Sequence, residues 1–203
     1  MTTISAAMVK ELRDKCGAGM MDCKKALEEN NGDMKLAAEY LQIKGLASAA
    51  KRSARKTSEG YIGVYRHHDG KTAIMVEVNC ETDFVARTEA FREFCQELAI
   101  HICGCKPQAV RREDLDAMLV AKQEEIFLQQ AMELGKNEEI TARIASGRVN
   151  AWLSEVTLLD QHWMGDSSES TVEQKRAALS SQTGENIRIH RFMSIVIGEC
   201  SAE

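Results

Sequence analysis

The sequence predicts an α+β protein, in which three short N-terminal helices precede a small antiparallel sheet with helices packed on one face. Two observations favour this class. Apolar residues recur at helical spacing through residues 4–44. Two strand-like runs, 61–67 and 71–79, are followed much later by a β-branched run at 187–197.

Residues 1–45 are expected to form a three-helix N-terminal module. Along this segment, side chains that can cap the start of a helix alternate with glycines that can end a helix. The caps are Ser5, Asp22 and Asp33, and the stops are Gly17, Gly32 and Gly45. Three amphipathic helices in about 40 residues make a small core, so the module is expected to be only marginally stable alone.

Residues 46–58 are predicted to form a basic linker helix after the N-terminal module. The segment 51–56 contains four basic residues and no acidic one. This segment has two interpretations. It contacts an acidic partner or RNA, or it is a solvated linker. We favour the linker, because charge runs without interleaved aromatic residues usually only solvate a helix face.

Residues 59–203 are predicted to form the α+β core that contains the sheet. Asp69-Gly70 is a strong hairpin signal, because glycine adopts the positive φ that a tight turn requires. A helix is expected to begin at Thr82 or Asp83 and to continue to residue 104. Further helices are expected at 112–134, 138–144, 147–159 and 172–181.

The composition argues against several classes of protein. The 203 residues include 44% hydrophobic and 28% charged residues, and no apolar run approaches the roughly 18 residues that span a membrane. A net charge of −5 argues against general nucleic-acid binding, which needs a basic surface. Seven cysteines, an odd number without a secretory signal, favour reduced thiols. We therefore expect a cytoplasmic protein with no direct nucleic-acid or membrane contact.

One cluster, formed by His101, Cys103 and Cys105 with Cys95 nearby, could be considered a metal site. On a continuous helix, residues two apart point about 200° apart, so these side chains converge only if the helix breaks. We interpret the cysteines as apolar packing residues and His101 as a satisfied core histidine. No nucleophile–base pair or phosphate-binding glycine loop is evident, so we expect neither enzymatic activity nor a cofactor nor a metal.

The most informative segment is residues 79–87, Asn-Cys-Glu-Thr-Asp-Phe-Val-Ala-Arg, which follows an alternating strand-like run at 74–78. Thr82 or Asp83 can cap the next helix. An acid and a large aromatic residue, Phe84, therefore lie side by side at the N-terminal tip of a helix that leaves a sheet. If buried, Phe84 is a core ring; if exposed, it can act as a wedge.

Residues 79–87 resemble the signature of bacterial elongation factor Ts, a family of nucleotide-exchange factors for the translational GTPase elongation factor Tu. A second segment, residues 17–27, reads Gly-Ala-Gly-Met-Met-Asp-Cys-Lys-Lys-Ala-Leu and resembles the same family's N-terminal signature. A looser similarity continues through 106–107, 156–161 and 184–187. The resemblance covers nearly the whole chain and is to the short forms of the family, which have a single copy of the core.

The resemblance implies a guanine-nucleotide exchange factor that promotes GDP release by binding nucleotide-free elongation factor Tu better than the GDP-bound form. By similarity, Thr82, Asp83, Phe84 and Val85 enter the GTPase near its magnesium and phosphate site. A carboxylate near the magnesium shell and an aromatic ring beside a switch helix are expected to weaken the retention of GDP, and linkage makes this effect reciprocal.

The same resemblance implies a contact through the N-terminal module, which is similar to a ubiquitin-associated fold. Met20, Met21 and Lys24 would contact the nucleotide-binding domain of the GTPase. The two methionines are predicted to lie in a turn, and the alternative for adjacent methionines is that one is buried in the core.

A third implied contact involves the hairpin. His67, in a Tyr-x-His motif, would reach a domain of the GTPase away from the nucleotide; the alternative is an exposed turn residue. The chain has no internal repeat, and a three-stranded sheet has open edges. We therefore expect a homodimer in which the second copy completes the sheet.

The alternative function is a helical interaction module that binds RNA or a ribosomal partner through residues 1–56. The acidity of the chain and the lack of stacking aromatic residues at 51–56 weigh against it. A thiol or zinc enzyme is a third hypothesis, which metal analysis would test.

Overall fold

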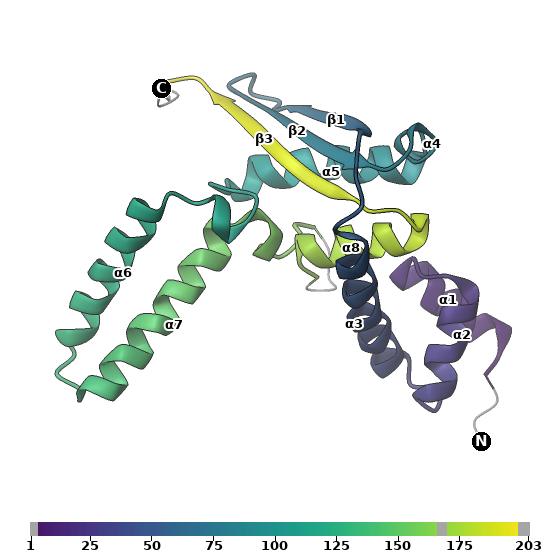
Figure 1. The fold of residues 1–203 in the computed structure, drawn as a ribbon, viewed down its shortest axis with the longest axis horizontal. Helices are drawn as coiled ribbons and strands as arrows, with labels where there is room; N and C mark the ends of the chain where they lie inside the picture. Colours follow the sequence, from purple (N-terminus) through teal and green to yellow (C-terminus); the bar gives the residue numbers. More distant parts are fainter. Residues whose placement is uncertain (1–3, 166–169, 199–203) are drawn as a thin grey trace. The chain divides into compact units, whose positions relative to one another are not determined.

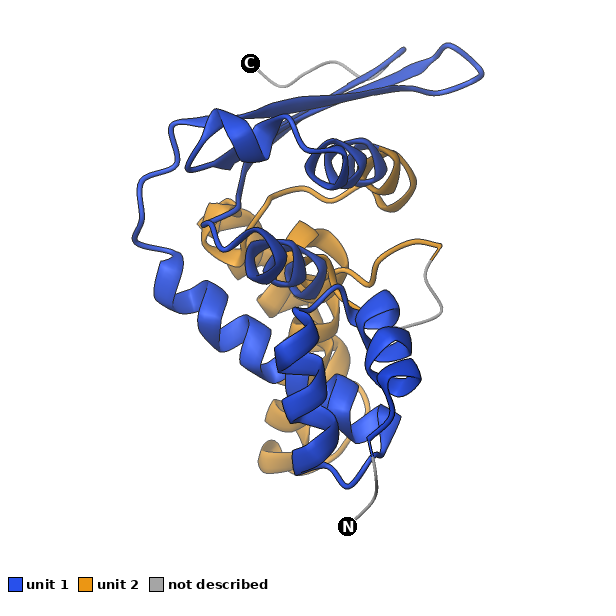
Figure 2. Cartoon of the chain, turned by 90° about the vertical axis from the view of Figure 1, so that its right-hand side faces the viewer, with its two compact units in different colours: residues 1–99, 173–203 blue, residues 100–172 orange. Residues whose placement is uncertain are grey.

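The computed structural model of the chain describes residues 4–165 and 170–198. It has the predicted α+β class, and its described residues form a three-stranded antiparallel sheet among helices (Figure 1). The chain divides into a first unit, residues 1–99 together with 173–203, and a second unit, residues 100–172 (Figure 2). The borders of these two units differ from those of the three domains that the sequence predicts, 1–45, 46–58 and 59–203. The three-domain organisation therefore stays a prediction.

The first unit begins with three helices, α1 (Ala6–Cys16), α2 (Met20–Glu29) and α3 (Met34–Arg52). Both predicted ends of α1 are confirmed: the Ser5 hydroxyl accepts a hydrogen bond from an amide of the first turn, and Gly17 closes the helix at φ 66°. Asp33 caps α3 with its carboxylate, also as predicted. The buried residues that the three helices share are Val9, Leu12, Cys23, Ala26, Leu27, Ala37 and Leu41.

Two helix ends differ from the prediction. α2 begins at Met20 with Gly19 as its N-cap, and Asp22 lies in the first turn, where its charge suits the positive end of the helix dipole. Gly45 does not end α3, which continues to Arg52. A glycine inside a helix costs about 1 kcal/mol relative to alanine, and the alanine-rich segment after it offsets this cost. Of the linker helix predicted at 46–58, residues 46–52 form the end of α3, whereas residues 53–58 are not helical.

The sheet consists of β1 (Glu59–Arg66), β2 (Thr72–Cys80) and β3 (Arg188–Val196), with β2 in the middle and both pairs antiparallel. The predicted hairpin is confirmed, since Gly70 takes φ 72° and the His67 amide donates to the Thr72 carbonyl at 2.9 Å. The last predicted helix is also present, as α8 (Val172–Thr183), and leads into β3.

One face of the sheet packs against α5 (Glu89–Cys105), as Figure 1 shows. Ile74 and Val76 of β2 are buried on this face. Gly63 brings β1 so close to α5 that a Cβ here would lie 2.3 Å from the Cys95 carbonyl oxygen. The opposite face carries exposed apolar side chains, which we call the apolar sheet face: Ile62, Val64, Met75, Met193 and Ile195.

The predicted helix from 83 to 104 is in fact two helices, α4 (Asp83–Ala86) and α5. Thr88 lies at the break, where its hydroxyl donates to the Val85 carbonyl at 2.8 Å and accepts from the Phe91 amide at 3.4 Å. It thereby closes α4 and caps α5. Hydrophobic periodicity did not indicate this break, because it reflects side-chain burial and not the backbone groups that Thr88 satisfies.

The second unit contains a helical hairpin formed by α6 (Ala117–Met132) and α7 (Glu138–Val156) (Figure 1). α6 begins after its cap Asp116 and not at residue 112, where the chain makes a single 3-10 turn. Gly147 does not separate two helices: α7 runs through it, and a Cβ there would meet nothing within 4 Å, so the position is open. Among the helices that the described residues form, none is both long and apolar enough to cross a bilayer.

Candidate functional site

At the end of β2 the chain turns into α4, and we call residues 82–86 the tip. Thr82, one of the two predicted caps, is the N-cap: its hydroxyl oxygen accepts a hydrogen bond from the Val85 amide at 3.4 Å. The Phe84 side chain is 80% exposed, whereas Ala86 is buried and anchors the helix. Of the two alternatives for Phe84, the structure therefore excludes the core ring.

Asp83 forms an ion pair at the tip. Its carboxylate lies 3.0 Å from the Arg87 guanidinium, one helical turn away, and both side chains are exposed. An exposed ion pair of this kind contributes about 0–1 kcal/mol to stability, so a partner could displace it easily. No role was predicted for Arg87, although opposite charges four residues apart on a helix are a signal for such an ion pair.

The tip is held from a distant part of the sequence by Glu185. One Glu185 carboxylate oxygen accepts the amides of Glu81 and Thr82 at 3.0 and 3.1 Å, and the other accepts the Thr82 hydroxyl at 2.6 Å. Glu81 in turn accepts the Asn186 amide at 2.6 Å. Residues 184–187 were part of the family resemblance, but no role was predicted for them. Their contacts join residues 103 to 105 positions apart in the sequence, and such contacts leave no local pattern.

Met20, Met21 and Lys24 lie on the first two turns of α2 and not in a turn before it. All three side chains are exposed, Met21 at 77%, so the alternative that one methionine is buried is wrong. Lys24 pairs with Glu28 at 3.7 Å. Two flexible apolar side chains beside a cation make an adaptable contact surface.

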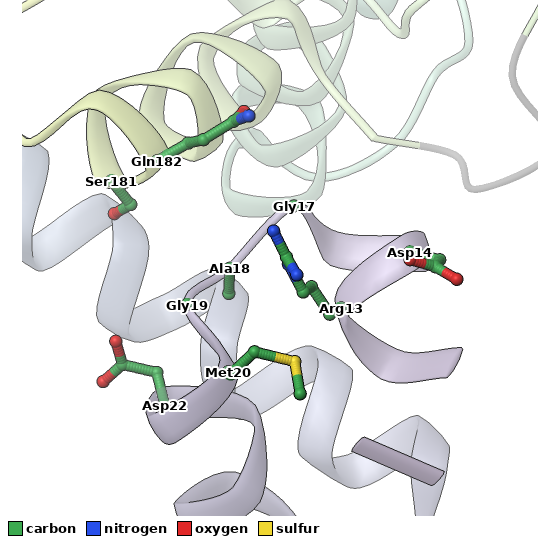
Figure 3. A pocket seen from close by; sticks show the side chains of 9 residues that line it. All are labelled: Arg13, Asp14, Gly17, Ala18, Gly19, Met20, Asp22, Ser181 and Gln182. Atoms are coloured by element: carbon green, nitrogen blue, oxygen red, sulfur yellow. The ribbon is translucent and has the colours of Figure 1, made fainter. Parts of the chain in front are cut away.

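A surface hollow of about 540 Å³ lies beside the start of α2 (Figure 3). Its lining consists of Arg13, Asp14, Gly17, Ala18, Gly19, Met20, Asp22, Ser181 and Gln182. The lining mixes a cation, two carboxylates and small residues, which matches no single class of ligand. The structure therefore brings Met20, but neither Met21 nor Lys24, to this hollow.

His67 lies at the opposite end of the β1–β2 hairpin from the tip. Its Nδ1 atom is 3.1 Å from the Tyr65 hydroxyl oxygen, and its half-buried ring lies edge-on to the tyrosine ring. β2 has nine residues, so the two ends of the hairpin are about 26 Å apart. The structure thus does not bring His67 and Phe84 into one site.

In the second unit, His101 is 1% exposed and is the satisfied core histidine that was predicted. Its Nδ1 atom accepts the Met164 amide at 3.1 Å, so Nε2 carries the proton and donates to the Gln161 side-chain oxygen at 3.0 Å. The ring also stacks on Trp163, with 5.5 Å between the ring centroids. Burial lowers the pKa of His101 below its ordinary value of 6.5, which keeps the ring neutral.

The cysteines near His101 belong to a helix that continues to Cys105 without a break, so Cys103 and Cys105 point to different sides. Within residues 4–165 and 170–198, no group of three or more His, Cys, Asp or Glu side chains could hold a metal ion. Burial raises the pKa of Cys80 to about 11 and that of Cys95 to about 12. Both thiols are therefore protonated at neutral pH and are poor nucleophiles.

Comparison with known proteins identifies the family. A sequence model described as elongation factor TS matches residues 34–170. The chain is 50% identical over 199 residues to elongation factor Ts of Solidesulfovibrio magneticus, and the alignment covers 98% of this chain and 99% of that protein. It is 46% identical over 197 residues to elongation factor Ts of Geobacter sulfurreducens, with 97% and 91% covered. The chain belongs to the elongation factor Ts family.

Membership of the elongation factor Ts family confirms what the two signature segments indicated. A shorter relative, elongation factor Ts of Thermosipho melanesiensis, is 43% identical over 196 residues and is covered completely. The full-length agreement with such relatives is consistent with the single core of this chain.

The tip of this elongation factor Ts family member is suited to contact with a partner. The tip offers an exposed aromatic ring and a carboxylate on a short helix, and Glu185 holds the backbone below them. An arrangement of this kind can insert a ring into a partner and bring a negative charge beside it.

Proposed function

We propose that this protein is a guanine-nucleotide exchange factor for elongation factor Tu. The observation that carries the proposal is the exposure of Phe84 on a short helix whose start is held by Glu185. The cap Thr82 donates two hydrogen bonds to the Glu185 carboxylate, and the Glu81 amide donates a third. A large apolar ring that is exposed on a fixed backbone gains free energy when a partner covers it. Family membership supports elongation factor Tu as that partner.

Exchange requires no covalent step, so the protein does not act as an enzyme in this proposal. It binds the nucleotide-free form of elongation factor Tu more tightly than the GDP-bound form. By linkage, GDP and the exchange factor weaken each other's binding to the same extent. GTP binding then releases the exchange factor by the same coupling.

The tip residues have distinct tasks in this mechanism. Phe84 inserts beside a switch helix of the GTPase, and Val85 extends the apolar surface next to it. Asp83 brings a negative charge toward the magnesium shell, which disfavours retention of the metal and of the phosphates. Thr82 caps α4 and so sets the direction in which Phe84 projects.

Two further contacts increase affinity in this proposal. Met20, Met21 and Lys24 bind the nucleotide-binding domain of the GTPase, and His67 binds a second domain. Because His67 and the tip lie about 26 Å apart at the two ends of the hairpin, one exchange factor can engage two domains at once. Linked contacts of this kind raise the overall affinity without any single strong contact.

The apolar sheet face supports a homodimer. Met75 lies at its centre, paired with Val64 on one side and Met193 on the other. The Glu77–Arg191 ion pair, at 2.8 Å, borders it. Exposed apolar patches with a polar rim mark interfaces, and a twofold axis brings the same patch of both copies together. We propose that the second copy covers this face, and not an open edge of the sheet as the sequence suggested.

The proposed function places the protein in the cytoplasm, where translation occurs, and one kinetic experiment tests it. Purified elongation factor Tu is loaded with the fluorescent analogue mantGDP and mixed with excess GDP, with and without this protein. We expect the fluorescence to decay faster as the protein is added, and the rate to saturate. A release rate that stays constant up to high concentrations of folded protein would overturn the proposal.

A further inference from the structure

The turn between α8 and β3 has a fixed conformation. Gly184 takes φ 75°, and its amide donates to the Ser180 carbonyl at 3.0 Å. The Ser180 hydroxyl, which is fully buried, donates to the Glu185 carbonyl at 2.6 Å. The end of α8 therefore sets the backbone from which the Glu185 side chain extends.

The Glu185 carboxylate receives three hydrogen bonds from the connection between β2 and α4, two from the amides of Glu81 and Thr82 and one from the Thr82 hydroxyl. Hydrogen bonds to an ionised carboxylate are about twice as strong as neutral ones. Glu185 therefore binds Thr82, which is both the N-cap of α4 and the first residue of the tip.

A second set of contacts surrounds the same turn. The Asn186 side-chain amide donates to the carbonyls of Ser53 and Arg55 at 3.2 and 2.9 Å. The Arg55 guanidinium lies 3.3 Å from the Glu81 carboxylate. Asn186 is only 3% exposed, so the side-chain amide that makes the two bonds to Ser53 and Arg55 is buried. The turn is therefore also held against residues 53–55.

At the tip itself, the Cys80 thiol donates to the Thr82 carbonyl at 3.1 Å, and the Asp83–Arg87 ion pair is exposed. α4 comprises four residues, of which Ala86 is buried. A single helical turn is not stable by itself, because nucleation fixes several residues for one hydrogen bond. The direction of Phe84 therefore depends on the contacts that fix the start of α4.

We propose that Glu185 is a positioning residue for nucleotide exchange, which acts by holding the backbone of Glu81 and Thr82 so that Phe84 points toward the partner. This inference rests on the proposed function and adds the residue that orients the tip. A ring held in its productive direction pays less conformational entropy on binding. In this proposal Glu185 makes no contact with the GTPase.

The first test needs no partner. Hydrogen exchange of the individual amides is measured by NMR for the wild type, Glu185→Ala, Glu185→Gln and Glu97→Ala. Glu97 is an exposed glutamate of α5, so its replacement controls for the loss of one charge. We expect faster exchange at the amides of Glu81 and Thr82 in Glu185→Ala and partial protection in Glu185→Gln, which keeps one acceptor oxygen. Unchanged protection of both amides in Glu185→Ala would overturn the proposal.

The second test measures mantGDP release from elongation factor Tu over a range of concentrations of each variant. Misplacing a catalytic contact by about 1 Å can cost on the order of a hundredfold, so we expect Glu185→Ala to lower the maximal rate roughly ten- to a hundredfold. Glu185→Gln should recover most of the rate, and Glu97→Ala should match the wild type. The half-saturating concentration should change less than the maximal rate.

A double variant separates positioning from a general loss of stability. If Glu185 acts through Phe84, Glu185→Ala should add little to the effect of Phe84→Ala, because the ring that it positions is already absent. Additive effects of the two substitutions would overturn the proposal. If wild-type protein fails to accelerate release at all, the proposed function itself fails; if the wild type accelerates release and Glu185→Ala does so equally, only this inference fails.

Discussion

Asp83 and Arg87 form an ion pair with 3.0 Å between the carboxylate and the guanidinium, so the tip presents its negative charge next to a cation. The ion pair lies within α4 and at its C-cap, beside the exposed Phe84 ring. It connects two properties of the tip that can be tested separately, the charge of Asp83 and the apolar surface of Phe84.

Asp83→Asn should slow exchange without loss of stability. Thr82, and not Asp83, caps α4, so the substitution removes one charge and leaves the cap intact. We expect a nearly unchanged melting temperature and a slower release of mantGDP that depends less on magnesium concentration. Arg87→Ala is the matched variant: it leaves the Asp83 carboxylate unpaired, and release should be at least as fast as in the wild type. If Asp83→Asn released mantGDP at the wild-type rate at every magnesium concentration, the proposed role of the charge would be wrong.

Phe84→Ala should reduce the maximal release rate while the protein stays folded. Because the ring is 80% exposed, we expect a stability change within about 0.5 kcal/mol, as for other surface substitutions. Phe91→Ala is the control, since this ring is fully buried and its truncation should cost about 3–5 kcal/mol. Stopped-flow release at saturating protein and chemical denaturation measure the two effects. Equal release rates for Phe84→Ala and the wild type would show that Phe84 does not contact the GTPase.

Lys24→Ala and Met21→Ala should weaken association with elongation factor Tu and leave the maximal release rate unchanged. Both side chains are exposed on α2, so neither change should disturb the core. Lys25→Ala is the matched control, because Lys25 is an exposed lysine of the same helix that also pairs with a glutamate four residues on. The half-saturating concentration in the mantGDP assay is the measurement. Equal shifts for Lys24→Ala and Lys25→Ala would indicate a general charge effect.

Met75→Glu should produce a monomer. Met75 lies in the middle of the apolar sheet face, where a buried carboxylate without a partner would be strongly unfavourable in a dimer. Sedimentation at micromolar concentration should give roughly twice 22.6 kDa for the wild type and one such mass for the variant. Gln96→Glu, an exposed position on α5, should remain dimeric. A wild-type protein that sediments as a monomer would contradict the dimer.

Stability should fall as the pH drops below about 6.5. Unfolded His101 takes up a proton near its ordinary pKa of 6.5, whereas burial lowers the pKa of the folded residue. Between these two values the unfolded state binds more protons, so lower pH favours unfolding. Urea denaturation at pH 7.5 and pH 5.5 measures the change, and His101→Gln should show a smaller change over this interval. An equal pH dependence in both proteins would mean that other groups cause it.

Local sequence signals predicted those parts of the structure that depend on neighbouring residues. Ser5, Gly17 and Asp33 act as helix caps or stops because the groups they satisfy lie within one turn. The Gly70 turn formed because its conformation needs a residue without a side chain. The same local reasoning failed at Gly45 and Gly147, where the helices continue, since helix-favouring neighbours outweigh one glycine.

The tip shows what the sequence by itself determined about this protein and what only the tertiary structure decided. The sequence determined the family, the class of fold and the adjacency of Asp83 and Phe84, because these follow from residue order and local spacing. Only the tertiary structure decided that Phe84 is exposed and that Glu185 holds the residues before it. Burial and long-range hydrogen bonds depend on how distant segments pack, and no local pattern records a contact between residues more than 100 positions apart.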